Sequence, residues 1–148
     1  MANPPKSAGW MLDPQIERDT LPVGDLPLCR LRLMNDVNYP WLLLVPRQPN
    51  ASEIADLDRA GRTQLMTEIT ETSQALKAIT GCDKINVASL GNVVAQLHVH
   101  VIARFRSDVA WPKPVWGAVP PHAHSSDTAA KLIAELRRRL ALGESSAT

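Results

Sequence analysis

The sequence lacks the features that would place the protein in a disulfide-bonded, membrane-spanning or highly charged class. Its two cysteines, Cys29 and Cys82, have no metal-ligand spacing and lie in apolar segments, which indicates reduced core residues of a cytoplasmic protein. The 16 Lys and Arg balance the 15 Asp and Glu, so the composition favours neither a nucleic acid polymer nor a membrane surface as a partner. No apolar run is long enough for a signal peptide or a membrane span. We therefore expect a soluble, cytoplasmic protein.

The 148 residues show no internal repeat and no sign of a second domain. This length is enough for one domain that buries a core of its own. We expect a single domain over 1–148, with a flexible arm at 1–9, a loop rich in proline and tryptophan at 106–125, and a C-terminal helix with its tail at 126–148.

Apolar periodicity and turn signals predict an α+β domain with an antiparallel sheet. A short helix is expected from Asp13-Pro14 to Glu17, because Asp13 can cap it and proline suits the first turn. A long helix follows, capped by Ser52 or Asp56 and ended by Gly81, and Ser126 or Asp127 caps a last helix at 129–140. The strands are expected at 21–25, 28–34, 41–45, 85–88 and 96–105.

The segment from Gln96 to Phe105 is the most distinctive one, because it is an apolar strand that carries two histidines. Side chains alternate between the faces of a strand, so one face is apolar and suited to a core. The other face carries Gln96, His98, His100, Ile102 and Arg104. An amide, two imidazoles and a guanidinium, about 7 Å apart along one line, form a layout suited to an anion. Gly91-Asn92, just upstream, adds backbone N–H groups that can approach a phosphate closely.

Four roles fit two histidines at i and i+2 on a strand. An imidazole can attack phosphorus as a nucleophile, or it can act as a general acid or base near neutral pH. The pair can bind a metal if a third ligand joins it, and His122 or His124 could supply that ligand. The pair can also be inert polar residues of the sheet. The residues alone leave these alternatives open.

At these residues the chain resembles the histidine triad (HIT) family of nucleotide hydrolases and transferases. The family motif is His-φ-His-φ-His-φ-φ, with φ apolar, and it matches Gln96-Leu97-His98-Val99-His100-Val101-Ile102 with glutamine at the first histidine position. The segments 103–105 and 110–117 look like a bacterial subgroup in which this glutamine is familiar, and whose members are commonly labelled diadenosine polyphosphate hydrolases. The resemblance implies a HIT-like fold, with an antiparallel sheet of about five strands, one long helix and one C-terminal helix.

The resemblance also implies roles for the residues of the motif. His98 matches the nucleophile that attacks the α-phosphate of a nucleoside polyphosphate, a dinucleoside polyphosphate or a phosphoramidate and forms a nucleotidyl-histidine intermediate. His100 matches the residue that hydrogen-bonds the phosphate or orients its neighbour. Gln96 can donate a hydrogen bond but carries no titrating proton. The alternative is a nucleotide-binding protein with little or no turnover. We expect no metal and no other cofactor.

Further substrate contacts are expected outside the motif. Asn35 matches a ribose contact, Asn86 matches another polar contact, and Gly91 and Asn92 match a phosphate contact. Val93 stands where family members place a phosphate-binding hydroxyl, and Trp41 stands where they often have a histidine. The predicted substrate-binding residues are Asn35, Asn86, Gly91, Asn92, Val93 and Arg104.

We also expect a homodimer, because family members usually pair through the long helix and the adjoining strand. Trp111 and Trp116 add modest support, since a large apolar loop is unfavourable on the surface of a monomer. The alternative is that both tryptophans pack against their own domain.

Overall fold

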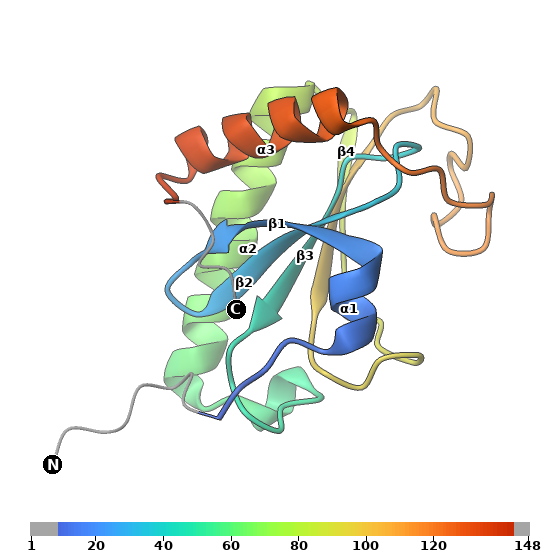
Figure 1. The fold of residues 1–148 in the computed structure, drawn as a ribbon. Helices are drawn as coiled ribbons and strands as arrows, with labels where there is room; N and C mark the ends of the chain where they lie inside the picture. Colours follow the sequence, from blue (N-terminus) through green and yellow to red (C-terminus); the bar gives the residue numbers. More distant parts are fainter. Residues whose placement is uncertain (1–8, 144–148) are drawn as a thin grey trace, which may run out of the picture.

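The computed structural model describes residues 9–143 and shows a five-stranded antiparallel sheet with helices on both faces (Figure 1). The strand order is β1 (Thr20–Asp25), β2 (Cys29–Met34), β3 (Trp41–Pro46), β5 (Val99–Arg104) and β4 (Lys84–Ala88). The helices are α1 (Pro14–Asp19), α2 (Arg59–Thr80) and α3 (Ser126–Arg139), with a short 3-10 turn η1 (Ile54–Asp56) before α2. The predicted α+β class is confirmed. Apart from Gly9, the expected arm at 1–9 lies outside the described residues, as does the tail after Gly143.

Two predicted helix starts are wrong. Asp58 caps α2, because its carboxylate accepts a hydrogen bond from the Gly61 N–H at 2.7 Å. The predicted cap Asp56 belongs to η1 instead, where it accepts from the backbone N–H of Ser52. Ser125 caps α3, which therefore begins at Ser126. The predicted end of α2 is confirmed, since Gly81 has a left-handed φ of 65° and donates its N–H to Lys77.

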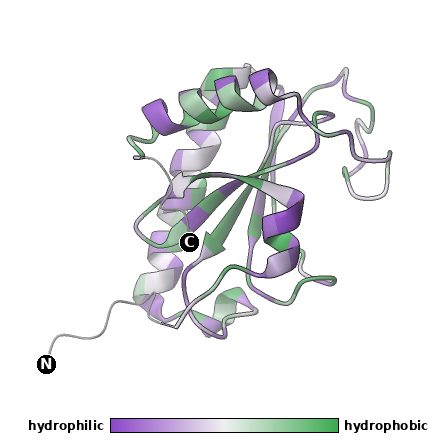
Figure 2. Cartoon of the chain, in the orientation of Figure 1, coloured by the Kyte–Doolittle hydropathy of each residue, from purple (hydrophilic) through white to green (hydrophobic). Residues whose placement is uncertain are grey.

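One face of the sheet packs against α2 and α3, which lie behind and above it in Figure 1. Leu65 and Leu76 of α2 and Leu136 of α3 share this core with the apolar face of the histidine segment. That face consists of Leu97, Val99, Val101 and Ala103, as expected, and Figure 2 shows the central strands in hydrophobic colours. Within residues 9–143, no helix is long and apolar enough to cross a membrane.

The opposite face of the sheet is also covered, although its strand β5 carries the polar side chains of His100 and Arg104. A second apolar cluster there joins Ile16 of α1 to Trp41 and Leu43 of β3 and to Val115 of the loop after β5. His98, His100 and Arg104 are consequently buried, with exposed fractions of 7%, 4% and 1%. The histidine face therefore lies beneath α1 and a loop, where a cavity can be screened from water.

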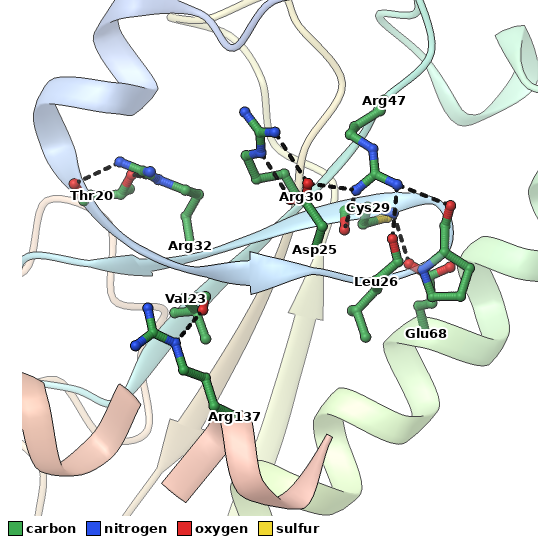
Figure 3. Close-up of polar contacts among 11 residues, drawn as sticks. Thr20, Val23, Asp25, Leu26, Cys29, Arg30, Arg32, Arg47, Glu68 and Arg137 are labelled. Atoms are coloured by element: carbon green, nitrogen blue, oxygen red, sulfur yellow. Dashed lines mark hydrogen bonds and ion pairs between the residues drawn. The ribbon is translucent and has the colours of Figure 1, made fainter. Parts of the chain in front are cut away.

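Polar contacts fix the β1–β2 end of the sheet to the helices (Figure 3). Arg47 donates to the carbonyl oxygens of Leu26 and Pro27, and Arg137 of α3 donates to the carbonyl oxygen of Val23. The buried carboxylate of Glu68 accepts from the backbone N–H groups of Leu28 and Cys29 at 2.9 and 2.8 Å. The Glu68 and Arg137 contacts anchor the β1–β2 hairpin to α2 and α3. The cavity described below lies at the opposite end of these two strands.

Both cysteines are free and buried, in line with the expected reduced core residues. Burial and the neighbouring Glu68 carboxylate raise the pKa of the Cys29 thiol far above its ordinary range. The thiol is therefore protonated and unreactive at neutral pH.

Candidate active site

A cavity of about 440 Å³ opens between α1, the ends of β2 and β3, and the segment that leads into β5. It is lined by Gln15, Ile16, Asp19, Thr20, Met34, Trp41, Leu43, Leu90, Asn92, Val93, Val94, His98, His100 and Trp116. The structure thus brings together four of the predicted site residues, His98, His100, Asn92 and Val93. A size of several hundred Å³ and a mostly apolar wall with a few convergent polar groups are typical of small-molecule sites.

His98 is held with one defined ring nitrogen available for chemistry. Its Nδ1 lies 2.7 Å from the carbonyl oxygen of Gln96. A carbonyl oxygen can only accept, so Nδ1 carries the hydrogen of the neutral ring and Nε2 keeps its lone pair. His98 lies one residue before β5 begins at Val99, because the chain there leaves the ladder and Leu97 donates its N–H to Ala51 instead. His98, the residue expected to be the nucleophile, is therefore at the entry of the strand.

His100 is held in the opposite tautomer. Its Nδ1 accepts a hydrogen bond from the indole Nε1–H of Trp41 at 3.0 Å, and its Nε2 lies 3.1 Å from the carbonyl oxygen of Leu90. An indole N–H only donates and a carbonyl only accepts, so the hydrogen of His100 is on Nε2. Burial, together with the neighbouring His98, lowers the pKa of His100 to about 4, against the opposing effect of the Leu90 carbonyl. At neutral pH His100 is an uncharged hydrogen-bond donor.

Trp116 closes the cavity from the loop side. Its ring packs edge-on against His100 and Trp41, with centroid separations of 5.0 and 5.7 Å. A second cavity of about 410 Å³ adjoins the first and shares Asp19, Met34, Trp41 and Trp116 with it. Asn35 lines this second cavity, where its side-chain oxygen accepts from the His124 N–H at 2.9 Å. Asp19 and Trp116 were not among the predicted site residues, and no local sequence pattern marks them.

Arg104 and Asn86 were expected at the substrate, but they line neither of these two cavities. The Arg104 guanidinium donates to Asp108, to the side-chain oxygen of Asn86 and to the carbonyl oxygen of Lys113. It also lies over the rings of Tyr39 and Trp111. Arg104 shares a face with His100, but it lies four positions further along the strand, a separation of about 13 Å. Its position is therefore beneath the 105–117 loop, which it holds in place.

The two loop histidines contact the end of β2 through their backbone. His122 and His124 donate their N–H groups to Asp36 and Asn35. Within residues 9–143, no three His, Cys, Asp or Glu side chains converge in a way that could hold a metal ion. The third ligand that a metal site would require is not placed beside His98 and His100.

Comparisons with known proteins agree with this fold. A family model described as the HIT domain matches residues 15–107. The structure is similar to a histidine triad protein from Bradyrhizobium japonicum, with 54% identity, a TM-score of 0.88, and coverage of 88% of this chain and 98% of that chain. A histidine triad protein from Sinorhizobium meliloti 1021 is 40% identical, with a TM-score of 0.88 and coverage of 90% and 98%. No curated protein sequence gives a significant match.

A more distant likeness concerns the fold alone. A hypothetical histidine triad nucleotide-binding protein from Sulfolobus tokodaii is 16% identical, with a TM-score of 0.64 and coverage of 84% of this chain and 86% of that chain. The five-stranded antiparallel α+β domain has the HIT-like fold of these histidine triad proteins. The family model covers more than half of the sequence, and this chain belongs to the HIT family.

Proposed function

We propose that this protein binds nucleoside phosphates and cleaves them at the α-phosphate, with His98 as the nucleophile. The observation that supports this most directly is the hydrogen bond from His98 Nδ1 to the Gln96 carbonyl oxygen, which leaves the lone pair on Nε2. Nε2 forms a bond to phosphorus while the bond to the leaving group breaks, and the leaving group departs with its electron pair. Water then attacks the nucleotidyl-His98, the N–P bond breaks, and the nucleoside monophosphate is released.

His100 supports this reaction as a neutral donor. Its ring centroid lies 4.9 Å from that of His98, and its hydrogen is on Nε2. In this proposal the Nε2–H turns from the Leu90 carbonyl oxygen to a phosphate oxygen when substrate binds. His100 does not act as an acid, because its charged form is strongly disfavoured at neutral pH.

The segment 90–94 supplies the remaining phosphate contacts in this proposal. Gly91 lies beside the His98 ring, since a Cβ at this position would be 3.6 Å from His98 Cε1. Asn92 and Val93 line the cavity, and Val93, at 94% exposed, offers its backbone but no hydroxyl. Asn35 faces the second cavity and is the proposed ribose contact. The substrates that fit are nucleoside polyphosphates, dinucleoside polyphosphates such as diadenosine polyphosphates, and phosphoramidates.

A nucleotide-binding protein with little turnover is the alternative, and Gln96 is the observation that favours it. In the bacterial subgroup that we infer for this chain, glutamine takes the place of the first histidine, and an amide cannot carry a proton to a leaving group. Two measurements on wild type and His98→Ala separate the two functions. The first is hydrolysis of adenylyl and guanylyl substrates, and the second is calorimetric binding of the nucleoside monophosphate. The exposed imidazole of His122 gives a matched control in His122→Ala.

The enzyme function predicts turnover by wild type and His122→Ala, loss of turnover in His98→Ala, and retained monophosphate binding in all three. A mass adduct of one nucleotidyl group on wild type but not on His98→Ala would identify the intermediate. Monophosphate binding without turnover of any substrate would establish the alternative, and neither binding nor turnover would refute both.

We also propose a homodimer that forms through β4 and α2. Two observations support it: β4 is an edge strand with Val87 48% exposed, and Met66 on α2 is 61% exposed. Trp111 and Trp116 give no support, because they pack on Arg104, Trp41 and His100 of their own domain. Light scattering should give twice the chain mass of 16.2 kDa, and a single chain mass would refute the dimer.

We also propose a cytoplasmic location, which the free, buried cysteines fit.

A further inference from the structure

The side chain of Gln96 is directed to the N-terminal segment and does not line the cavity. Its Nε2 donates to the carbonyl oxygen of Met11 at 2.7 Å, and its Oε1 accepts from the backbone N–H of Asp13 at 2.8 Å. Both ends of the amide are therefore bonded to backbone more than 80 residues away in the sequence. A residue that stands at the first position of the histidine motif thus contacts α1 and not the cavity.

The segment that Gln96 holds leads directly into a wall of the cavity. Asp13 is the N-cap of α1 and accepts from the Gln15 N–H at 2.8 Å. Gln15, Ile16 and Asp19 of this helix line the cavity. With six residues, α1 is too short to be stable by itself, so its position depends on the contacts that hold its ends. The C-terminal end is held by Arg32, which donates to the carbonyl oxygens of Glu17 and Thr20.

The backbone of Gln96 makes the contact that sets the tautomer of His98. The same carbonyl oxygen that accepts from His98 Nδ1 belongs to the residue whose side chain binds Met11 and Asp13. We propose that Gln96 is a positioning residue that ties α1 to His98 and so fixes the cavity wall relative to the nucleophile. The effect on substrate rests on the proposed nucleotide site, whereas the tie between Gln96 and α1 does not.

The chemistry of the amide explains why glutamine suits this position. A neutral amide donates and accepts at one planar end, which matches a carbonyl and an N–H two residues apart. A glutamate accepts but cannot donate, so Gln96→Glu keeps the bond from Asp13 and sets a carboxylate against the Met11 carbonyl oxygen. Gln96→Met keeps the length of the side chain and removes both hydrogen bonds.

Hydrogen exchange of the α1 amides tests the tie without any ligand. We expect exchange at residues 13–19 to be about tenfold faster in Gln96→Met and Gln96→Glu, since one or two modest hydrogen bonds are lost. Asp13→Ala, which removes the cap, should also speed exchange there. Gln74 is an exposed glutamine of α2, and Gln74→Ala should leave exchange in α1 unchanged. Unchanged exchange in both folded Gln96 variants would overturn the proposal.

Binding and turnover test the consequence for the site. With adenosine monophosphate as the probe, we expect the Kd of Gln96→Met to rise about tenfold. In turnover, KM should rise while kcat at saturation changes less than about threefold, because the helix wall is displaced and the nucleophile is retained. A fall in kcat with unchanged Kd would overturn the positioning role and place Gln96 at the reacting phosphate. If wild type neither binds nor turns over nucleotides, the proposed function fails, and the exchange experiment alone decides the tie.

Discussion

Trp41 donates its indole N–H to Nδ1 of His100 across 3.0 Å, and this hydrogen bond joins two neighbouring strands at the floor of the cavity. The indole is only a donor, so the bond can form only while Nδ1 of His100 carries no hydrogen. Trp41 therefore holds His100 as a neutral ring with its hydrogen on Nε2. The two histidines of the motif consequently keep opposite tautomers, since His98 carries its hydrogen on Nδ1.

Trp41→Phe should remove the hydrogen bond to Nδ1 of His100 and leave the Leu90 carbonyl oxygen as the one partner of the ring that favours this tautomer. The phenyl ring keeps most of the packing but leaves the buried Nδ1 without a donor, which we expect to lower the free energy of unfolding by about 1–3 kcal/mol. The nitrogen NMR shift of His100 Nδ1 should move because it loses its donor, while the Leu90 carbonyl oxygen keeps the hydrogen on Nε2. Trp116→Phe is the control, because Trp116 meets His100 through a ring edge, and it should leave the tautomer in place. An unchanged His100 spectrum in Trp41→Phe would contradict the role of the indole.

His100 should make the protein less stable as the pH falls. Burial lowers the pKa of His100 to about 4, whereas an unfolded histidine has a value near 6.5. The unfolded chain therefore binds more protons between these two values, so the stabilisation is complete above pH 6.5 and is lost as the pH falls toward 4. The difference corresponds to about 3 kcal/mol. Urea unfolding from pH 7.5 to 4.5 should give a steeper decline for wild type than for His100→Gln. An equal decline in the free energy of unfolding with pH in the two proteins would contradict this role of His100.

The Arg104–Asp108 ion pair should matter far more than an exposed pair of the same type. The side chains of Arg104 and Asp108 are 2% and 5% exposed and lie 2.8 Å apart, so Asp108→Asn leaves a buried guanidinium without its carboxylate. We expect a loss of about 3 kcal/mol in the free energy of unfolding, together with a change in tryptophan fluorescence as the 105–117 loop loosens. Asp25→Asn removes the more exposed partner of Arg30 and should cost less than about 1 kcal/mol. Similar losses in both variants would show that the loop does not depend on this pair.

Local patterns in the sequence predicted the fold better than the site. Strand alternation correctly assigned Leu97, Val99 and Val101 to the main core, because a period of two needs no knowledge of distant residues. Capping residues were harder, since Asp56 and Asp58 are both suitable and only the 3-10 turn decides between them. The antiparallel sheet of about five strands followed from element order and the family resemblance together, whereas the order of the strands in the sheet came from the structure.

The site depended on contacts that alternation does not reveal. The alternation correctly placed Arg104 on the same face as His100. It could not show that a different segment covers Arg104, or that Asp108 is its ion-pair partner. Gln96 likewise shares the motif with His98, yet its side-chain partners lie at residues 11 and 13. Trp116 reaches His100 from a proline-rich loop without regular structure, so no periodic signal could place it.

Gly91→Ala should weaken nucleotide binding if the segment 90–94 contacts phosphate. A Cβ at Gly91 would lie 2.9 Å from the carbonyl oxygen of Val94, closer than such atoms approach, so the backbone of the segment must shift. The same Cβ would stand 3.6 Å from His98 Cε1, which is ordinary contact, so His98 itself need not move. We expect the Kd for adenosine monophosphate to rise about tenfold, the effect of losing one or two hydrogen bonds to the phosphate.

The matched control for this variant is Gly143→Ala, because a Cβ at Gly143 meets nothing within 4 Å. It should bind the monophosphate as wild type does, and both variants should keep a native circular dichroism spectrum. Because the strain in Gly91→Ala lies between the new Cβ and a backbone carbonyl of the same short segment, a loss of binding without a loss of fold would locate the phosphate contact in residues 90–94. Wild-type affinity in Gly91→Ala would instead remove this segment from the proposed site and leave the phosphate to His98 and His100.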